Sequence, residues 1–300
     1  MSKINLVLDA SMLDVFLTCK MKFNLRHNLL KTAEELATPL DRGGVLHVGE
    51  EAYYKSLQSE PGKWELAVDR GLVRVRYELS SNSQLDTNSG NRILDVLEES
   101  WKIHKYKDLS YEILAVESPF SYILHEDEQF RIIMIGKIDL LVNDAPNYFN
   151  LPIDHKSYER SFPLKRLTNQ FLNYSYAVQS NFLFVNRVGM AESISLGHGK
   201  STKDPAARHK RVPLSFDPLI WNWWKKNTVQ TIMEYYDCAQ SGIWPANLTS
   251  CDKYNRICEY YENYCDVSGQ ENRDYKLATY FKDAKPWDVS AALVSTPKGD

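Results

Sequence analysis

Two aspartates and a lysine near the middle of this 300-residue chain have the types and spacing that hydrolytic chemistry requires. Asp139 lies near the end of residues 131–142, a largely apolar and β-branched run that predicts a buried strand. Asp154 and Lys156 belong to a second run, residues 148–156, and share one face of it. Neighbouring carboxylates repel unless a cation lies between them, and oxygen ligands select Mg²⁺ or Mn²⁺. Because a lysine beside them can orient water or stabilise phosphate charge, the set indicates metal-dependent cleavage of phosphodiesters.

The surrounding elements follow from turn and helix signals. A polar segment, residues 143–147, separates the two runs, so we expect a β-hairpin. The helix that follows holds Gln170 and Tyr174 four positions apart, on one face. Residues 64–104 have a helical pattern with a break at 80–83, and they carry no evident chemistry.

Two further helices are expected. Ser11 followed by Asp14 resembles a capping box with Asp in place of Glu, and it would open a helix on which Cys19 lies. Residues 218–240 have aromatic and aliphatic side chains at helical spacing, which predicts an amphipathic helix.

The ordered set resembles a known family. Asp139 with the Asp154-x-Lys156 pattern resembles the core of the PD-(D/E)XK nucleases, and Gln170 with Tyr174 resembles the Gln-x-x-x-Tyr motif of their RecB-like branch. By this resemblance, Lys156 positions the attacking water or stabilises the phosphate under attack. Gln170 and Tyr174 would orient Lys156 or the substrate strand.

The resemblance extends to the metal ligands. Gly43 and His47 resemble the Gly-x-x-x-His motif of RecB-like nucleases, in which the histidine binds metal. Glu117 lies on an expected strand over residues 111–124, where related nucleases commonly have an acidic residue. A solvated or salt-bridged role for Glu117 is the alternative. The implied ligands of Mg²⁺ or Mn²⁺ are His47, Asp139, Asp154, the backbone carbonyl of His155 and, as a further candidate, Glu117.

Three evenly spaced cysteines, Cys251, Cys258 and Cys265, predict a second ligand set. Zinc and [4Fe–4S] sites usually take four ligands, and both Cys19 and Cys238 are candidates for the fourth. One cysteine near the N-terminus and three near the C-terminus resemble the iron–sulfur staple of RecB-like exonucleases. That group includes the AddB nuclease domain and the CRISPR-associated RecB-like exonucleases. The resemblance implies a [4Fe–4S] cluster with Cys19 as the fourth ligand, and a structural Zn²⁺ remains the alternative.

A basic segment over residues 200–211 is a candidate for contact with DNA, with a solvated loop as the alternative. Its four candidate residues are Lys203, Arg208, Lys210 and Arg211. The preceding GHGKST sequence, residues 197–202, lacks the first glycine of a Walker A motif, because that position is Ile194. Since Lys203-Asp204-Pro205 also predicts no helix start, we expect no nucleotide binding.

Composition bounds the class of protein. The net charge of −3 argues against a strongly basic protein that coats nucleic acid. A nuclease needs only a local basic channel, so this charge is compatible with DNA binding. No apolar run is long enough to cross a membrane, and the N-terminus lacks the pattern of a signal peptide, so a cytoplasmic protein is expected. In a reducing compartment, five cysteines are expected as thiols or ligands.

We therefore predict a single α/β domain over residues 1–283 with a restriction-endonuclease-like core, a mixed central β-sheet flanked by helices. Residues 58–108 are expected as a helical insert, and Cys19 with residues 251–265 as a staple that joins the N- and C-terminal parts. Residues 284–300 are expected as a flexible tail.

The predicted function is that of a metal-dependent DNA nuclease, an exonuclease on single-stranded or end-containing DNA. The expected context is recombination, repair or phage- or CRISPR-related DNA processing. One alternative is a RecB-like protein that binds DNA or a partner with little or no cleavage. Another is a metal-dependent hydrolase of a different substrate.

Overall fold

The computed structural model of the chain describes six stretches. They are residues 3–33, 38–81, 83–158, 164–197, 200–252 and 257–284. Two compact units can be distinguished. The terminal unit consists of Met1–Leu36, Phe120–Gly136 and Leu219–Asp300, and the central unit of Ala37–Pro119 and Lys137–Pro218. Apart from Ala284, the expected tail lies outside the described residues.

The central unit contains the predicted hairpin. β4 (Phe130–Asp144) and β5 (Tyr148–Tyr158) pair in antiparallel fashion across a turn at residues 145–147. β5 pairs in parallel with β6 (Phe182–Gly189), which pairs in antiparallel fashion with β9 (Lys210–Ser215). The sheet is therefore mixed, and the predicted α/β fold class is confirmed.

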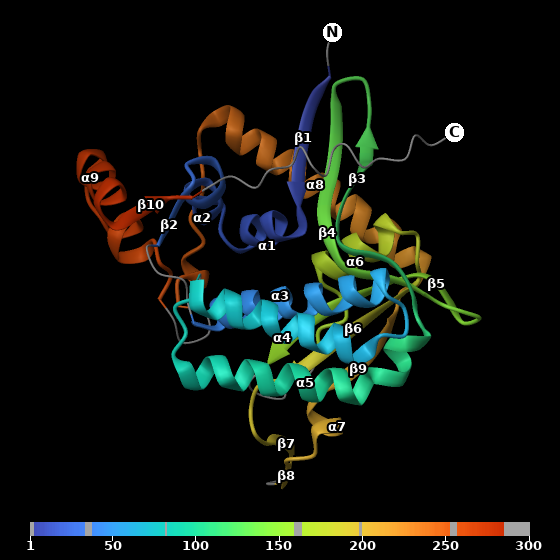
Figure 1. Cartoon of the computed structure of the whole chain (residues 1–300). Coiled ribbons are helices and arrows are strands. Elements are labelled where there is room, and N and C mark those ends of the chain that lie inside the picture. The colour runs from blue at the N-terminus through green and yellow to red at the C-terminus, as the bar shows by residue number, and fades with distance from the viewer. Residues whose placement is uncertain are drawn as a thin grey trace. The chain divides into compact units, whose positions relative to one another are not determined.

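Helices α3 (Thr38–Ser59) and α5 (Thr87–Ser110) contact strands of this sheet, and α4 (Trp64–Ser81) packs on α3 and α5 (Figure 1). The helical pattern of residues 64–104 and its break are confirmed by α4 and α5. Both helices supply core residues to one hydrophobic cluster with the strands, so they build the core of the unit and do not merely cover it. Examples from this cluster are Leu72, Leu97, Trp101, Leu140 and Ile153.

The basic segment of residues 200–211 is not a simple loop, contrary to expectation. It contains β8 (Lys200–Thr202), which pairs with β7 (Ile194–Gly197), and the short helix α7 (Pro205–Arg208). The prediction that no helix starts here is wrong. The side chain of Asp204 caps α7 by accepting a hydrogen bond from the Ala206 N–H at 3.0 Å.

The terminal unit begins with β1 (Ile4–Asp9), which pairs in parallel with the first half of β4. β3 (Glu112–Glu126) also pairs with β4, and both of these long strands run through parts of each unit. α1 (Ala10–Thr18) is capped by Asp9, two residues before the expected Ser11. Cys19, expected on this helix, instead lies in extended conformation between α1 and α2 (Lys20–Phe23).

Near the two ends of the chain, two short strands lie side by side. β2 (Lys31–Ala33) and β10 (Phe281–Asp283) form an antiparallel pair. The terminal unit also contains the amphipathic α8 (Pro218–Ser241), as predicted, and α9 (Gln270–Tyr280). Short helical segments lie at Asn24–Asn28, Leu248–Ser250 and Tyr261–Cys265. Within the described part of the chain, every helix is too short or too polar to cross a lipid bilayer.

The first test concerns Gly136, where β4 approaches the ring of Phe120. A Cβ atom at this position would lie 2.3 Å from Phe120 Cζ, so Gly136→Ala must displace the ring. We expect a loss of about 1–3 kcal/mol in the free energy of unfolding, measured by urea denaturation. Gly44→Ala in α3 is the matched control, because its added Cβ would have no atom within 4 Å except its chain neighbours and the backbone of its own helix. The control should be neutral or stabilising by about 0.5–1 kcal/mol, and equal losses in the two variants would contradict the packing argument.

Candidate metal centre

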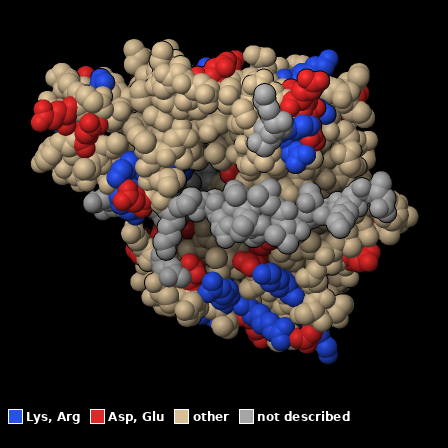
Figure 2. All heavy atoms as spheres, turned by 90° about the horizontal axis from the view of Figure 1, so that it is seen from above, with Lys and Arg blue, Asp and Glu red and all other residues tan. Residues whose placement is uncertain are grey.

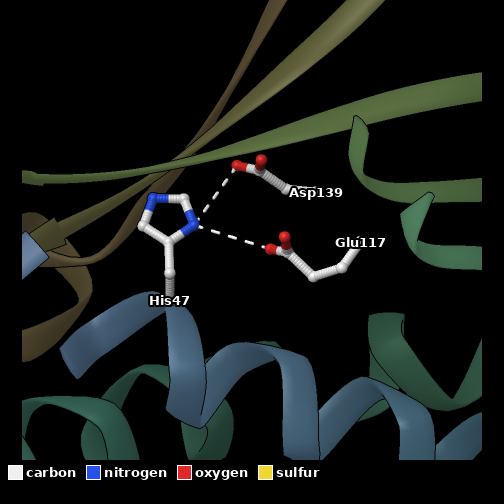
Figure 3. Close-up of side chains that lie close together, drawn as sticks. All are labelled: His47, Glu117 and Asp139. Atoms are coloured by element: carbon white, nitrogen blue, oxygen red, sulfur yellow. Dashed lines mark ion pairs between the residues drawn. The ribbon is translucent and has the colours of Figure 1, made fainter. Parts of the chain in front are cut away.

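Three side chains of the central unit converge on one point (Figure 3). Nδ1 of His47 on α3 lies 3.6 Å from Oδ2 of Asp139 on β4 and 3.8 Å from Oε1 of Glu117 on β3. The ligand atoms of these three residues lie within 4.8 Å of one another. An imidazole and two carboxylates at this spacing can hold a divalent cation.

The backbone of Glu117 is unusual. Its φ of +49° lies in the left-handed region, which residues other than glycine rarely adopt. Such a conformation persists only where the surroundings impose it, and it is found preferentially at functional sites. Here it accompanies the placement of the carboxylate beside His47. The salt-bridged role weighed for Glu117 is present, because the side chain forms an ion pair with Lys137, and the same carboxylate belongs to the candidate metal group.

Burial and mutual repulsion characterise the two aspartates. Burial, followed by the charge of Asp154, raises the pKa of Asp139 to about 6. Burial also raises the pKa of Asp154 above its ordinary value. For His47, burial acts to lower the pKa, but Glu117 and Asp139 together outweigh it and the pKa is raised. The centre thus holds more negative charge than a buried site tolerates without a cation.

Strand pairing explains why the aspartates meet. Leu140 of β4 lies opposite Ile153 of β5, and continuing this antiparallel register by one residue sets Asp139 opposite Asp154. Directly opposed residues of antiparallel strands project from the same face. The backbone N–H of His155 in addition donates a hydrogen bond to Oδ2 of Asp139 at 2.9 Å.

A chain of hydrogen bonds leads away from Asp154. Lys156 Nζ donates to Asp154 Oδ1 at 2.9 Å and to Gln170 Oε1 at 3.0 Å. Gln170 Nε2 donates to the Tyr174 hydroxyl at 3.0 Å, across one turn of α6 (Asn169–Ala177). The structure therefore brings the predicted Gln170 and Tyr174 to Lys156 and fixes the direction of its ammonium group.

His155 belongs to a buried polar group behind the metal centre. Its Nδ1 lies 3.1 Å from Asn186 Nδ2 and 3.7 Å from Glu50 Oε1. Glu50 accepts a hydrogen bond from Trp101 Nε1 at 2.8 Å, and burial raises its pKa to about 7. Sequence reasoning assigned only the carbonyl of His155 and missed this group. The one available signal was the placement of Glu50 three residues after His47 on the same helix.

Two cations of the basic segment are buried, which corrects the expected DNA contact. The side chain of Arg211 is 7% exposed and pairs with Asp108 at 2.9 Å, and that of Arg208 is 4% exposed and pairs with Glu99 at 2.6 Å. Lys203 and Lys210 are exposed. On the face in Figure 2, basic side chains stand in small groups with acidic neighbours. The buried arginines stabilise the fold and do not present their guanidinium groups to a ligand.

The predicted cysteine set lies in the terminal unit. Cys19 Sγ accepts a hydrogen bond from the Asn247 N–H at 3.4 Å, and the Cys258 N–H donates to the Cys251 carbonyl at 2.6 Å. Burial, followed by the charges of Cys258, Cys19 and Cys251, raises the pKa of Cys265 to about 11. These four thiols are thus electrostatic neighbours. Among the described residues, no three of their sulfur atoms lie within 4.8 Å of one another.

Comparison with known proteins identifies the family. The model of the PD-(D/E)XK nuclease superfamily matches residues 8–266. The chain belongs to the PD-(D/E)XK nuclease superfamily. Membership implies a metal-dependent nuclease, a hydrolase with a DNA substrate. The side chains of His47, Glu117 and Asp139, called the His47 group below, are placed so that they can hold a divalent ion. No match was found among curated proteins.

One similar solved structure is described as the crystal structure of SSO0001. It has 12% sequence identity and a TM-score of 0.28, and the match covers 63% of this chain and 84% of that chain. At this level of similarity, the match adds no functional argument.

The electrostatics of this PD-(D/E)XK centre give the second prediction, for metal-free protein. The folded pKa of Asp139, about 6, exceeds the ordinary value of 3.8, so its charge destabilises the folded state above about pH 6, and the penalty disappears below about pH 4. Asp139→Asn should therefore stabilise the metal-free protein at pH 7 by on the order of 1–3 kcal/mol. Thermal unfolding in EDTA across pH 4–8 measures this.

Glu117→Gln is the matched control with the opposite sign. Burial acts to raise the pKa of Glu117, but His47 and Lys137 outweigh it and the pKa is lowered. Its carboxylate therefore stabilises the folded state above the ordinary pKa, and Glu117→Gln should lower the melting temperature at pH 7. Loss of stability in both variants would contradict this assignment of charges.

Proposed function

We propose that this protein is an Mg²⁺- or Mn²⁺-dependent deoxyribonuclease of the RecB-like branch, acting as an exonuclease on single-stranded or end-containing DNA. The observation that carries the proposal is the hydrogen-bonded series from Tyr174 through Gln170 and Lys156 to Asp154 beside the His47 group. The ammonium group held by Asp154 and Gln170 lies beside the candidate metal ligands, where a catalytic lysine is required, and this placement favours cleavage over binding alone.

The metal ligands in this proposal are the predicted ones, His47, Asp139, Asp154 and the His155 carbonyl, together with Glu117. A cation fits this set because Oδ2 of Asp154 is buried and accepts no hydrogen bond in the described structure. Carboxylates that are buried and close together raise each other's pKa, and a hard divalent cation relieves that repulsion. When bound, the ion supplies a more acidic water and stabilises charge on the phosphate.

Lys156 would act on the attacking water or the phosphate. Asp154 is fully buried, whereas the Lys156 side chain is 39% exposed, so the ammonium group lies where the buried centre meets solvent. Two acceptors, Asp154 and Gln170, fix its position before substrate binds, which lowers the reorganisation needed in the transition state. The Tyr174 hydroxyl in turn fixes the Gln170 amide, so that its oxygen faces the lysine.

We further propose that the exposed Lys203 and Lys210 contact the DNA backbone. None of the five cysteines forms a disulfide, which agrees with a cytoplasmic enzyme of DNA recombination, repair or phage- or CRISPR-related processing. A RecB-like protein that only binds DNA or a partner is the alternative that the assays below distinguish.

A [4Fe–4S] staple of Cys19, Cys251, Cys258 and Cys265 is the second part of the proposal. In a cubane each thiolate binds a different iron, so the sulfur atoms stand farther apart than around a single ion. The mutual charge effects among these thiols and the N–H donated to Cys19 Sγ support such a site. A structural Zn²⁺ would need all four sulfur atoms around one ion.

The proposed nuclease activity is tested with Asp154→Asn and Lys156→Met. Each should fold but lose at least a hundredfold in rate, about 3 kcal/mol of transition-state stabilisation. The assay is Mn²⁺-dependent digestion of end-labelled linear single-stranded DNA, with circular single-stranded DNA to separate exonuclease from endonuclease action. Near-wild-type cleavage by Asp154→Asn would refute the site. Equal digestion of circles would refute the exonuclease mode.

The staple is tested by anaerobic purification. The protein should be brown and contain about four iron and four sulfide per chain. Serine at Cys19, Cys251, Cys258 or Cys265 should remove the colour and lower solubility, because cluster binding also contributes folding free energy. Cys238→Ser on α8 is the matched control and should keep the colour. If the protein is colourless and contains one bound zinc, the [4Fe–4S] proposal is refuted and a structural zinc site is supported.

A further inference from the structure

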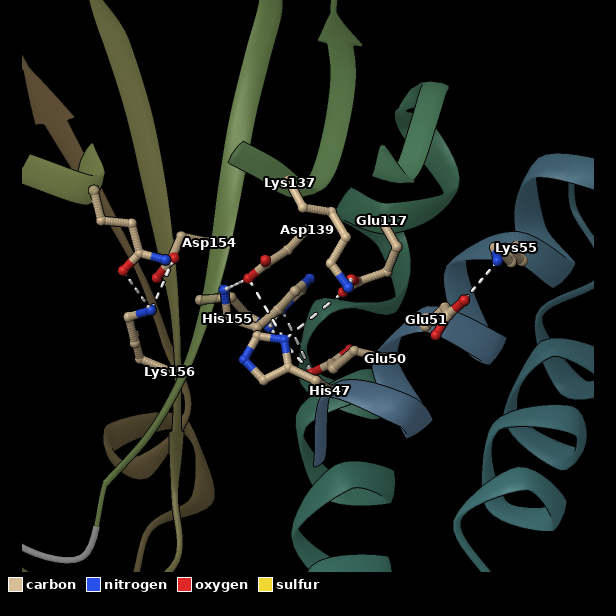
Figure 4. A network of polar contacts seen from close by, with 12 residues as sticks. His47, Glu50, Glu51, Lys55, Glu117, Lys137, Asp139, Asp154, His155 and Lys156 are labelled. Atoms are coloured by element: carbon tan, nitrogen blue, oxygen red, sulfur yellow. Dashed lines mark hydrogen bonds and ion pairs between the residues drawn. The ribbon is translucent and has the colours of Figure 1, made fainter. Parts of the chain in front are cut away.

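The metal centre has a second lysine, Lys137, that the proposed mechanism does not use. In Figure 4, Lys137 and Lys156 lie on opposite sides of the His47 side chain. Lys137 precedes Asp139 by two residues on β4, so both side chains project from the same face of the strand. The side chain of Lys137 is 51% exposed and that of its ion-pair partner, Glu117, is 10% exposed. A half-exposed cation therefore stands beside a buried anionic centre.

The two oxygens of Glu117 have different partners. Oε1 lies 3.8 Å from His47 Nδ1, whereas Oε2 forms an ion pair with the ammonium group of Lys137. The charges of Glu51 and Asp139 also act on Lys137. A divalent ion at the His47 group would share this carboxylate with the ammonium group and would be repelled by it. Lys137 and the metal ion thus compete for one ligand.

We propose that Lys137 is an internal competitor that lowers the metal affinity of the free enzyme, and that it exchanges Glu117 for a phosphate of the DNA when substrate binds. The proposal rests on the metal-dependent nuclease function given above. The lysine side chain is long and flexible and carries a compact charge, so it can turn from a carboxylate to a phosphate oxygen without a backbone change. Because half of its side chain is exposed, a phosphate in solution can reach the ammonium group.

The exchange couples metal and DNA. A DNA phosphate that withdraws Lys137 from Glu117 removes the competitor, so DNA raises the affinity for the ion. By linkage, the ion raises the affinity for DNA by the same factor. The free enzyme would then hold its catalytic ion weakly and load it fully only on substrate.

Calorimetric titration of the DNA-free protein with Mn²⁺ tests the competition. Lys137→Met should bind Mn²⁺ roughly tenfold more tightly than the wild type, since a nearby positive charge is removed and Glu117 is released. Lys137→Gln should do the same if the methionine variant folds poorly, and Lys137→Arg should remain near wild type. The matched control is Lys105→Met, because Lys105 on α5 pairs with Glu65 on α4 at 3.2 Å, and this pair involves neither Glu51 nor a member of the His47 group. Its Mn²⁺ affinity should not change.

A second titration tests the coupling with a phosphorothioate single-stranded oligonucleotide that resists hydrolysis. The oligonucleotide should tighten Mn²⁺ binding in the wild type and much less in Lys137→Met. Unchanged or weaker Mn²⁺ binding by the DNA-free Lys137→Met would overturn the competition, and equal tightening would overturn the exchange. If the wild type bound no Mn²⁺ at all, the metal site itself would be refuted, and this proposal with it.

Discussion

Repulsion between Asp139 and Asp154 is the interaction on which the rest of the site depends. The β4–β5 register places these carboxylates on one face, and burial raises the pKa of both. Basic side chains therefore lie beside both carboxylates. Lys156 donates a hydrogen bond to Asp154, and His47 Nδ1 lies 3.6 Å from Asp139 Oδ2. A divalent cation completes the same compensation in a PD-(D/E)XK nuclease, so the stability of the metal-free site and its need for an ion have one electrostatic origin.

Behind this centre, buried polar groups hold the backbone in place. The indole N–H of Trp101 donates a hydrogen bond to Glu50, and the side-chain amide of Asn186 is hydrogen-bonded to the ring of His155. The backbone N–H of His155 donates to Asp139. Buried polar groups destabilise a fold unless they are paired, and paired networks favour one arrangement over others. Helices α3 and α5 of the central unit therefore do more than cover the sheet. They supply Glu50 and Trp101, which belong to the buried polar group around His155 on β5.

Agreement between sequence and structure is best where the signal is local. The hairpin of β4 and β5 and the long amphipathic α8 were predicted, because strand alternation, turn residues and helical periodicity act over a few neighbouring positions. Local signals also failed at element ends. Asp9 caps α1 in place of Ser11, and Asp204 begins a helix where none was expected, because several residues nearby can serve as caps and the surrounding packing selects one.

The sequence by itself determined the spacing of Asp154 and Lys156, the helical pairing of Gln170 with Tyr174, and the family that this order indicates, since each is fixed by separation along the chain. Only the tertiary structure decided which distant side chains meet. Glu117 lies on a strand more than sixty positions after His47, and one of its carboxylate oxygens faces that histidine. The other oxygen forms an ion pair with Lys137. Arg208 and Arg211 were predicted to contact DNA because they lie in a basic segment. In the structure they are buried and form ion pairs with Glu99 and Asp108, about a hundred positions earlier in the chain. Burial and long-range charge pairing arise from the packing of whole elements, and no short sequence pattern encodes them.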